Sequence, residues 1–136
     1  MNKTRVTVID DDASVLRSLE RLLHVAGYET GGFPSVESFL ASGEGSITNC
    51  LILDLLLPGM CGLEALGLLK RDLPKMKVII ISGCGRAKNR EVLEAARRLG
   101  ADACFSKPLD AAELLATVRQ LLQRQEEAPR SREALI

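Results

Sequence analysis

Two hydrophobic patterns alternate along the chain from residue 4 to about residue 122. Short apolar runs rich in β-branched residues predict strands, as in TRVTVI at residues 4–9 and KVIIIS at residues 77–82. The stretches between such runs carry apolar residues every three or four positions, as in residues 13–26 and 63–73, and this spacing predicts helices. The pattern therefore predicts five strands that alternate with five helices.

Local signals mark several ends of the predicted elements. Gly27 and Gly100 each follow a predicted helix, and Ser35 has the side chain of a helix N-cap. The segment GEGSITN, residues 43–49, is predicted as a loop. The predicted strands are residues 4–9, 28–33, 50–54, 77–82 and 101–106, and the predicted helices are residues 13–26, 35–42, 63–73, 87–99 and 110–124.

The third and fourth predicted strands are apolar on both faces. Strands of this kind lie in parallel sheets that helices cover on both sides. The weak strand YETGGF, residues 28–33, is predicted at an edge of the sheet. The predicted fold is therefore α/β, a doubly wound parallel sheet flanked by helices. Because the crossovers of such a sheet are right-handed, its strands carry their functional loops at one common edge.

The hydrophobic pattern stops near the C-terminus. The segment QRQEEAPRSREALI, residues 123–136, is polar, mixed in charge and interrupted by Pro129. This predicts one domain at residues 1–124 and a polar tail or linker at residues 125–136. The length of 136 residues suits one domain, and the apolar share of 46% is enough to form a core.

The charge balance and the lack of long apolar runs narrow the classes of function. Lys and Arg number 18, as do Asp and Glu, so nothing electrostatic favours direct binding to nucleic acid or to an anionic membrane. No apolar run resembles a signal peptide or approaches the roughly 20 residues that span a bilayer. We expect a cytoplasmic protein. The four cysteines lack the spacing of a zinc site, and disulfides are not expected in that compartment.

Polar side chains occur at the carboxyl ends of four predicted strands. They are Asp10, Asp11 and Asp12 after the first strand, Asp54 at the third, Ser82 at the fourth and Lys107 at the fifth. Each has an ordinary explanation by itself, as a helix N-cap, a turn residue, a loop residue or a solvated lysine. Four such coincidences at one edge of a sheet are much less plausible. Together these residues predict a ligand site at that edge.

The same residues stand in motifs that resemble the receiver domain of two-component response regulators, over residues 4 to about 122. The acid pair of that family corresponds to Asp10 and Asp11 in VIDDDASV. The phosphoacceptor corresponds to Asp54 in LILDLLLPGMCGLE, where Pro58 and Gly62 also match. The hydroxyl and lysine positions correspond to Ser82 in VIIISG and to Lys107 in CFSKPL, followed by Pro108.

The resemblance implies a metal site as well as a fold. The fold is a five-stranded sheet in the order 2-1-3-4-5, and the peptide bond between Lys107 and Pro108 is cis. Clustered carboxylates raise one another's pKa unless a cation lies among them, and hard oxygen ligands suit Mg²⁺ or a similar divalent cation such as Mn²⁺. The implied ligands are Asp11 and Asp54 directly, Asp10 through water, and the backbone carbonyl of Leu56. The main role expected of Asp12 is then at the start of the helix that follows, as its N-cap or close to it.

The resemblance also implies a signalling function. Asp54 accepts a phosphoryl group from a partner histidine kinase or phosphotransfer protein, and Ser82 and Lys107 contact that group. The phosphorylated state then switches an interaction surface toward an output domain or protein that the motifs do not identify. A homodimer that forms on phosphorylation is compatible with this. The protein is not expected to be an enzyme beyond transferring the phosphoryl group to itself and losing it slowly.

One departure from the family pattern concerns the switch, and two other positions concern the lifetime of the phosphate. Cys104 stands where the family usually has an aromatic residue, and the neighbouring Phe105 is predicted to face the other side of the sheet. The resemblance also implies that Leu56 and Cys84 flank the approach of a hydrolytic water. Neither side chain carries a group that could orient water, so slow hydrolysis is expected.

Three alternatives differ in class. A phosphatase of the haloacid dehalogenase type would need a second Asp two residues after Asp54, where the chain has Leu56. A Rossmann nucleotide binder is disfavoured because no G-x-G-x-x-G follows the first strand. A pseudo-receiver, which acts only as a phosphorylation-independent interaction domain, stays open as the alternative. Against it, every acidic, hydroxyl and lysine position of the motif is filled.

Overall fold

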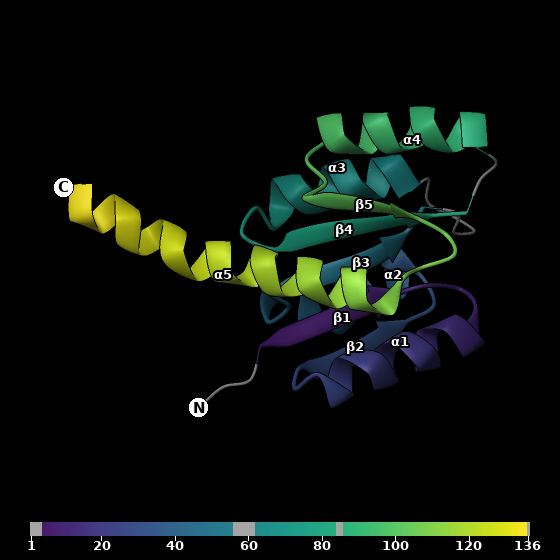
Figure 1. Ribbon diagram of the computed structural model, residues 1–136, viewed down its shortest axis with the longest axis horizontal. Coiled ribbons are helices and arrows are strands. Elements are labelled where there is room, and N and C mark those ends of the chain that lie inside the picture. The colour runs from purple at the N-terminus through teal and green to yellow at the C-terminus, as the bar shows by residue number, and fades with distance from the viewer. Residues whose placement is uncertain (1–3, 56–61, 84–85, 136) are drawn as a thin grey trace.

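The computed structural model of the protein describes residues 4–55, 62–83 and 86–135, and of residues 86–89 and 124–135 it describes the backbone alone. The described residues form a sheet with helices on both sides (Figure 1). The strands are β1 (Arg5–Ile9), β2 (Glu29–Phe33), β3 (Cys50–Asp54), β4 (Lys77–Ser82) and β5 (Ala103–Ser106). The helices are α1 (Ala13–Val25), α2 (Val36–Ser42), α3 (Gly62–Asp72), α4 (Arg86–Arg98) and α5 (Ala111–Leu135), with a 3-10 turn at Glu44–Ser46.

The sheet is parallel and has the strand order β2-β1-β3-β4-β5, which confirms the predicted fold. Strand β3 lies in the centre, with Leu53 paired with Ile9 of β1 and with Ile80 of β4. Strand β2 lies at an edge, as its weak pattern predicted. Because the strands are parallel, their carboxyl ends meet at one edge of the sheet, at the right in Figure 1.

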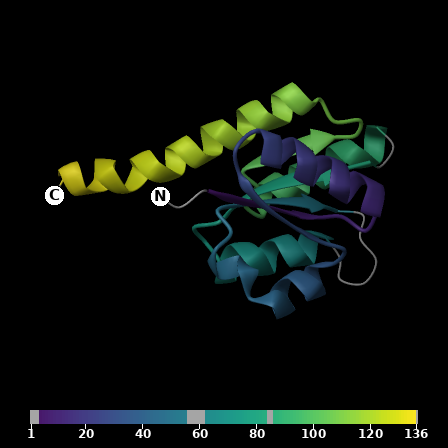
Figure 2. The ribbon, with the colours of Figure 1, turned by 90° about the horizontal axis from the view of Figure 1, so that it is seen from below.

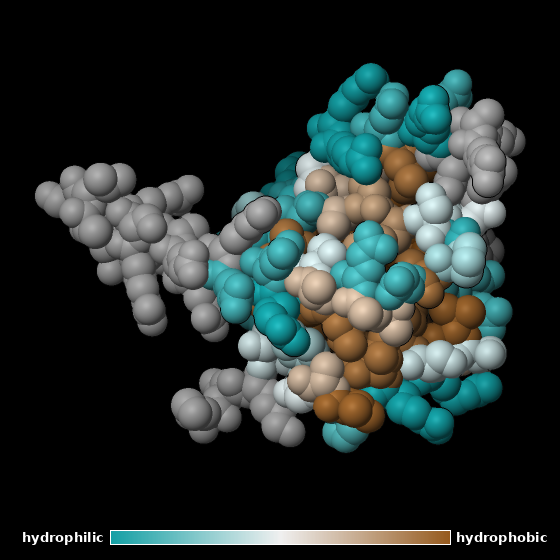
Figure 3. Space-filling model, in the orientation of Figure 1, coloured by the Kyte–Doolittle hydropathy of each residue, from teal (hydrophilic) through white to brown (hydrophobic). Residues whose placement is uncertain are grey.

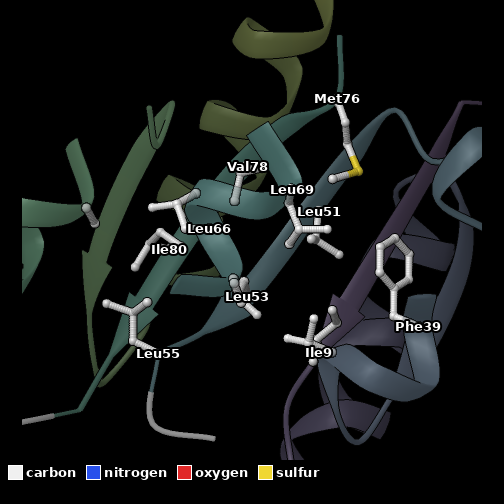
Figure 4. Packing of buried hydrophobic residues seen from close by; sticks show 13 residues of the cluster. Ile9, Phe39, Leu51, Leu53, Leu55, Leu66, Leu69, Met76, Val78 and Ile80 are labelled. Atoms are coloured by element: carbon white, nitrogen blue, oxygen red, sulfur yellow. The ribbon is translucent and has the colours of Figure 1, made fainter. Parts of the chain in front are cut away.

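Two apolar cores lie on opposite faces of the sheet. One packs α2, α3 and α4 against the sheet, and Figure 4 shows Leu66 and Leu69 of α3 pointing toward Leu51 and Val78 of the strands. The other packs α1 and α5 through Leu23 and Val118. Figure 2 shows α1 and α5 on one side of the sheet and α2 and α3 on the other. Both faces of β3 are therefore buried, which explains its unbroken apolar sequence.

Apolar and hydrophilic side chains are also separated on the surface of the molecule. On the face seen in Figure 3, apolar side chains are concentrated in the middle, where α5 crosses the sheet, and hydrophilic side chains lie over the part of α4 whose side chains the structure describes. Within the described part of the chain, no helix is long and apolar enough to cross a membrane.

The structure confirms most of the local features that the sequence predicted. The Ser35 side chain accepts a hydrogen bond from the Ser38 N–H and caps α2. Gly27 and Gly100 follow α1 and α4 with φ of 101° and 107°, a left-handed conformation that favours glycine. Cys104 packs on the core beneath α4 while Phe105 packs on the core beneath α5, which confirms that the two side chains face opposite sides of the sheet.

Two segments differ from the prediction. Residues 43–49, predicted as a loop, contain the 3-10 turn Glu44–Ser46. Helix α5 was predicted to end at residue 124, but it runs to Leu135 and extends well beyond the sheet (Figure 1). Its distal part is rich in Gln, Glu, Arg and Ala, which favour helix even where no apolar face is present, so a polar sequence did not mean an irregular one. The division into a domain at 1–124 and a tail stays a prediction.

The start of α3 makes a close contact with the strand that carries Asp54. A Cβ atom at Gly62 would lie 2.6 Å from the Leu55 carbonyl oxygen and 2.8 Å from the Leu55 Cα. Gly67, in the same helix, would meet nothing within 4 Å. We therefore expect Gly62→Ala to lower the free energy of unfolding by about 1–3 kcal/mol through overpacking. Gly67→Ala should raise it by about 0.5–1 kcal/mol through helix propensity.

Urea unfolding of the two variants tests this contact. The two substitutions add the same methyl group to the same helix, so each serves as the control for the other. Equal effects of the same sign would contradict the close approach of Gly62 to Leu55.

Candidate functional site

The four strand-end positions predicted from the sequence meet at the carboxyl edge of the sheet. Asp10 follows the last residue of β1, and Asp54 is the last residue of β3. Ser82 is the last residue of β4, and Lys107 follows the last residue of β5. The Leu55 N–H donates to the Ile81 carbonyl and the Lys107 N–H to the Ser82 carbonyl, each at 3.0 Å, so hydrogen bonds continue from strand to strand beyond the ladder.

Three carboxylates lie together at this edge. One oxygen of each of Asp10, Asp11 and Asp54 lies within 4.8 Å of the others. The residues Asp10 and Asp54 are only 1% and 3% exposed, whereas Asp11 faces solvent. The group therefore opens to solvent on the side of Asp11 and is closed by the sheet on the side of the other two.

The two oxygens of Asp10 have different surroundings. Its Oδ1 accepts a hydrogen bond from the Asp12 N–H at 2.9 Å. Its Oδ2 is buried and accepts no hydrogen bond from any residue that the structure describes, although the Lys107 Nζ lies 3.7 Å away. Burial raises the pKa of Asp10 above its ordinary value, and the nearby Asp54 carboxylate adds to this, while the Asp12 N–H and the Lys107 charge act in the opposite direction.

Lys107 supplies the positive charge of the site. Its Nζ donates a hydrogen bond to the Asp54 Oδ2 at 3.1 Å, and the peptide bond that follows, to Pro108, is cis, as predicted. Burial alone lowers the pKa of Lys107, but the hydrogen bond and the charge of Asp54, together with Asp10, raise it more, so the net direction is upward. The lysine is therefore held in its charged form by the two buried carboxylates.

Gly83 leaves room for this lysine. A Cβ atom at residue 83 would lie 3.3 Å from the Lys107 Cδ, which is tighter than an ordinary contact. This role of Gly83 was not predicted, and no local signal in the sequence marks it, because the contact joins segments that only the fold brings together.

Asp12 belongs to the helix rather than to the carboxylate group. Its side chain accepts hydrogen bonds from the N–H groups of Ser14 and Val15, at 2.9 and 3.3 Å, and so caps α1. This is the role that the sequence predicted for it. The contact from its own N–H to Asp10 was not predicted.

Some predicted positions lie outside the described residues. They include Leu56, whose backbone carbonyl was predicted as a metal ligand, and Cys84, which was predicted to flank the approach of water, as well as Pro58. Cys104, by contrast, is half-buried, and its Sγ lies 3.8 Å from the Leu93 carbonyl oxygen of α4, toward which it donates. It is a small side chain at the contact of α4 with the sheet.

The residues present fit a hard divalent cation. All the donors are carboxylate oxygens, they converge within 4.8 Å, and the Asp10 Oδ2 is a buried anionic atom that lacks a hydrogen bond among the described residues. A cation among them would offset the repulsion and the burial cost of these charges. Oxygen donors with one open, solvent-facing side suit Mg²⁺, which keeps several waters of its own.

Comparisons with known proteins agree on one family. The sequence model described as response regulator receiver domain matches residues 6–119. The transcriptional regulatory protein FixJ of Azorhizobium caulinodans is 36% identical over 129 residues, which cover 95% of this chain and 60% of FixJ. The response regulator protein TodT of Pseudomonas putida is 34% identical over 129 residues, which cover 92% of this chain and 56% of TodT. The chain thus spans less than two thirds of these relatives.

A solved structure shows the same fold. The crystal structure of a CheY-like response regulator receiver domain protein from Methanospirillum hungatei matches with a TM-score of 0.84 and 30% identity. The match covers 93% of this chain and 99% of that one. The likeness therefore extends over the whole sheet and over the helices on both of its faces.

Proposed function

This chain belongs to the response regulator receiver domain family, and we propose that it is a working phosphoryl acceptor whose acceptor residue is Asp54. One observation carries this proposal. Lys107 Nζ lies 3.1 Å from the Asp54 Oδ2, beside a group of three convergent carboxylates, which brings together a candidate nucleophile, an ammonium group and oxygen ligands for a metal ion. Two of these three acids, Asp10 and Asp54, are buried close together, an arrangement that is costly without a cation and that favours a metal-dependent acceptor over a pseudo-receiver.

The proposed reaction forms one bond and breaks one. An oxygen of the Asp54 carboxylate attacks the phosphorus of a phosphorylated histidine on a histidine kinase or phosphotransfer protein. The bond from phosphorus to the imidazole nitrogen breaks, and the nitrogen takes up a proton. The product is an aspartyl phosphate on this chain. Such transfers depend mainly on positioning and on neutralising charge, which the residues around Asp54 can supply.

Two residues of the chain would bind the incoming group. Lys107 can move its hydrogen bond from Asp54 to a phosphoryl oxygen, because its Nζ already lies between Asp54 and Asp10. The Ser82 hydroxyl, at the end of the neighbouring strand, can donate to a second oxygen. Asp10, Asp11 and Asp54 would hold a magnesium ion. When bound, the ion neutralises charge on the carboxylates and on the phosphoryl group.

The phosphorylated state would carry a signal rather than turn over a substrate. A bond from Ser82 that exists only with phosphate present can bias a two-state element, as other phosphorylation switches do. We propose that the phosphorylated state acts on an output domain or on a separate output protein, neither of which the motifs identify. The equal numbers of acidic and basic residues argue against direct binding to nucleic acid by this domain.

The experiment that tests the proposal needs no partner protein. The purified chain is incubated with acetyl phosphate, with Mg²⁺ or with a chelator, and its intact mass is measured. We expect the mass of one phosphoryl group to be added in Mg²⁺ and very little to be added with the chelator. No gain in Mg²⁺ would favour the pseudo-receiver alternative.

The phosphate should be lost slowly, and this proposal rests on the sequence at Leu56 and Cys84. Neither side chain carries a carboxylate or amide that could orient a water toward the bond from Asp54 to phosphorus, and lacking such a group costs about 10²-fold or more in rate. We expect the double variant Leu56→Asn with Cys84→Glu to lose phosphate faster than the wild type. Intact mass, measured over time after the phosphodonor is removed, follows this loss. Equal rates would show that these two positions do not set the lifetime.

A further inference from the structure

Helix α1 begins directly at the carboxylate group, and a single residue joins the two. We infer that Asp12 is a positioning residue, which holds Asp10 and Asp11 in the arrangement that binds a divalent cation without being a ligand itself. The inference rests on the proposed function, because it concerns the metal site of the proposed acceptor.

The backbone of Asp12 fixes the orientation of Asp10. The Asp12 N–H donates to the Asp10 Oδ1 at 2.9 Å. With one oxygen held in this way, the other, Oδ2, is directed toward the Lys107 Nζ, 3.7 Å away. Without the bond from the Asp12 N–H, only the longer ion pair with Lys107 would, among the described residues, orient this buried carboxylate.

The side chain of Asp12 fixes the backbone that makes this bond. It accepts hydrogen bonds from the N–H groups of Ser14 and Val15, and the Asp12 carbonyl accepts the first helical bond from the Leu16 N–H at 3.0 Å. The residue itself is extended, with φ of −86° and ψ of 110°. Both the direction of its N–H and the start of α1 therefore depend on the cap.

The connection is short, so the cap acts directly on the site. Only residues 10–12 lie between the end of β1 at Ile9 and the start of α1 at Ala13. Asp11 is held between two residues that are themselves fixed, Asp10 by the Asp12 N–H and Asp12 by the helix. A change in the cap would move both implied ligands of this turn together.

Asp12 is not itself placed to bind the cation. The carboxylates that converge among the described residues are Asp10, Asp11 and Asp54. The Oδ1 of Asp12 already accepts two backbone N–H groups of the helix. Its effect on the metal should therefore survive replacement by a neutral side chain that still caps, and should be lost with one that does not.

Three substitutions and one control separate these roles. Asn and Ser cap helices about as well as Asp, and Ala does not. The matched control is Asp110, which caps α5 by accepting from the Glu113 N–H at 3.1 Å but lies outside the carboxylate group. Binding of Mg²⁺ to each purified protein is measured by isothermal titration calorimetry, and the fold is checked by circular dichroism.

We expect Asp12→Ala to weaken Mg²⁺ binding about tenfold, the size found when a group that orients a metal ligand is removed. Asp12→Asn and Asp12→Ser should stay within about twofold of the wild type. Asp110→Ala should lose a helix cap of the same kind and leave the affinity for Mg²⁺ unchanged.

Other outcomes would overturn the inference. Unchanged affinity in Asp12→Ala would show that the cap does not position the ligands. Equal weakening by Asn, Ser and Ala would assign the effect to the charge of Asp12. If Asp12→Ala does not fold, the Asn and Ser variants decide between cap and charge. A wild type that binds no Mg²⁺ would contradict the proposed function itself, and the inference with it.

Discussion

The variant Asp54→Asn is expected to gain no phosphoryl group at this site from acetyl phosphate and Mg²⁺, while keeping its fold. An amide lacks the negative oxygen that attacks phosphorus, so the acceptor is removed rather than weakened. Asn has nearly the same shape as Asp, and its carbonyl oxygen can still accept the hydrogen bond from Lys107 that Asp54 accepts at 3.1 Å. The variant should therefore lose phosphorylation because the nucleophile is missing, while its packing changes little.

Intact mass after incubation measures this result, and peptide mapping locates any group that is added. Asp72→Asn is a suitable control, because the Asp72 side chain is 56% exposed, lies at the C-terminus of α3 and bonds only to its neighbour Arg71 among the described residues. The control should gain one phosphoryl group as the wild type does. Full phosphorylation of Asp54→Asn would refute the assignment of the acceptor.

The second large effect is that of Asp10→Asn on the free energy of unfolding, and it depends on whether Mg²⁺ is present. Without the metal, Asp10→Asn should raise the free energy of unfolding by about 1–2 kcal/mol, because burial disfavours the charged form of this carboxylate and the amide carries no charge. Lys107 keeps its partner Asp54 in the variant, so no cation is left unpaired. With saturating Mg²⁺, the wild type should gain stability from binding, and the variant should gain much less.

Urea unfolding of the wild type and of Asp10→Asn, each in a chelator and in Mg²⁺, gives the four free energies of unfolding. Circular dichroism is the suitable signal, because the chain contains no Trp. Asp72→Asn again serves as the control, and its stability should respond to Mg²⁺ as that of the wild type does. A variant Asp10→Asn that is less stable than the wild type in the chelator would show that the carboxylate is net stabilising without metal.

The effect of Asp10 should also depend on pH. Burial raises its pKa in the folded protein above the ordinary value of 3.8, so between the two values the folded state binds more protons than the unfolded state. Stability that depends on this group therefore falls as pH rises through that window and is constant above it. In a chelator, the advantage of Asp10→Asn over the wild type should be absent in acid, grow as pH rises from about 3.8, and then level off.

The element pattern of the receiver fold was accessible from the sequence because its signals are local. The apolar runs of β3 and β4 predict buried parallel strands, and Gly27 and Gly100 mark helix ends with a conformation that glycine favours. The end of α5 was not accessible in the same way. A helix without an apolar face gives no periodic signal, so its extension to Leu135 could not be distinguished from a polar tail.

The sequence by itself also determined which residues stand at the strand ends, because Asp10, Asp54, Ser82 and Lys107 each follow an apolar run. Only the tertiary structure decided that Asp10 and Asp54 are buried while Asp11 faces solvent, and that the Asp12 N–H orients Asp10. The physical reason is that burial and charge pairing depend on distances between remote parts of the chain. Asp54 and Lys107 are 53 residues apart in sequence, yet their charged atoms lie 3.1 Å apart once the strands have paired.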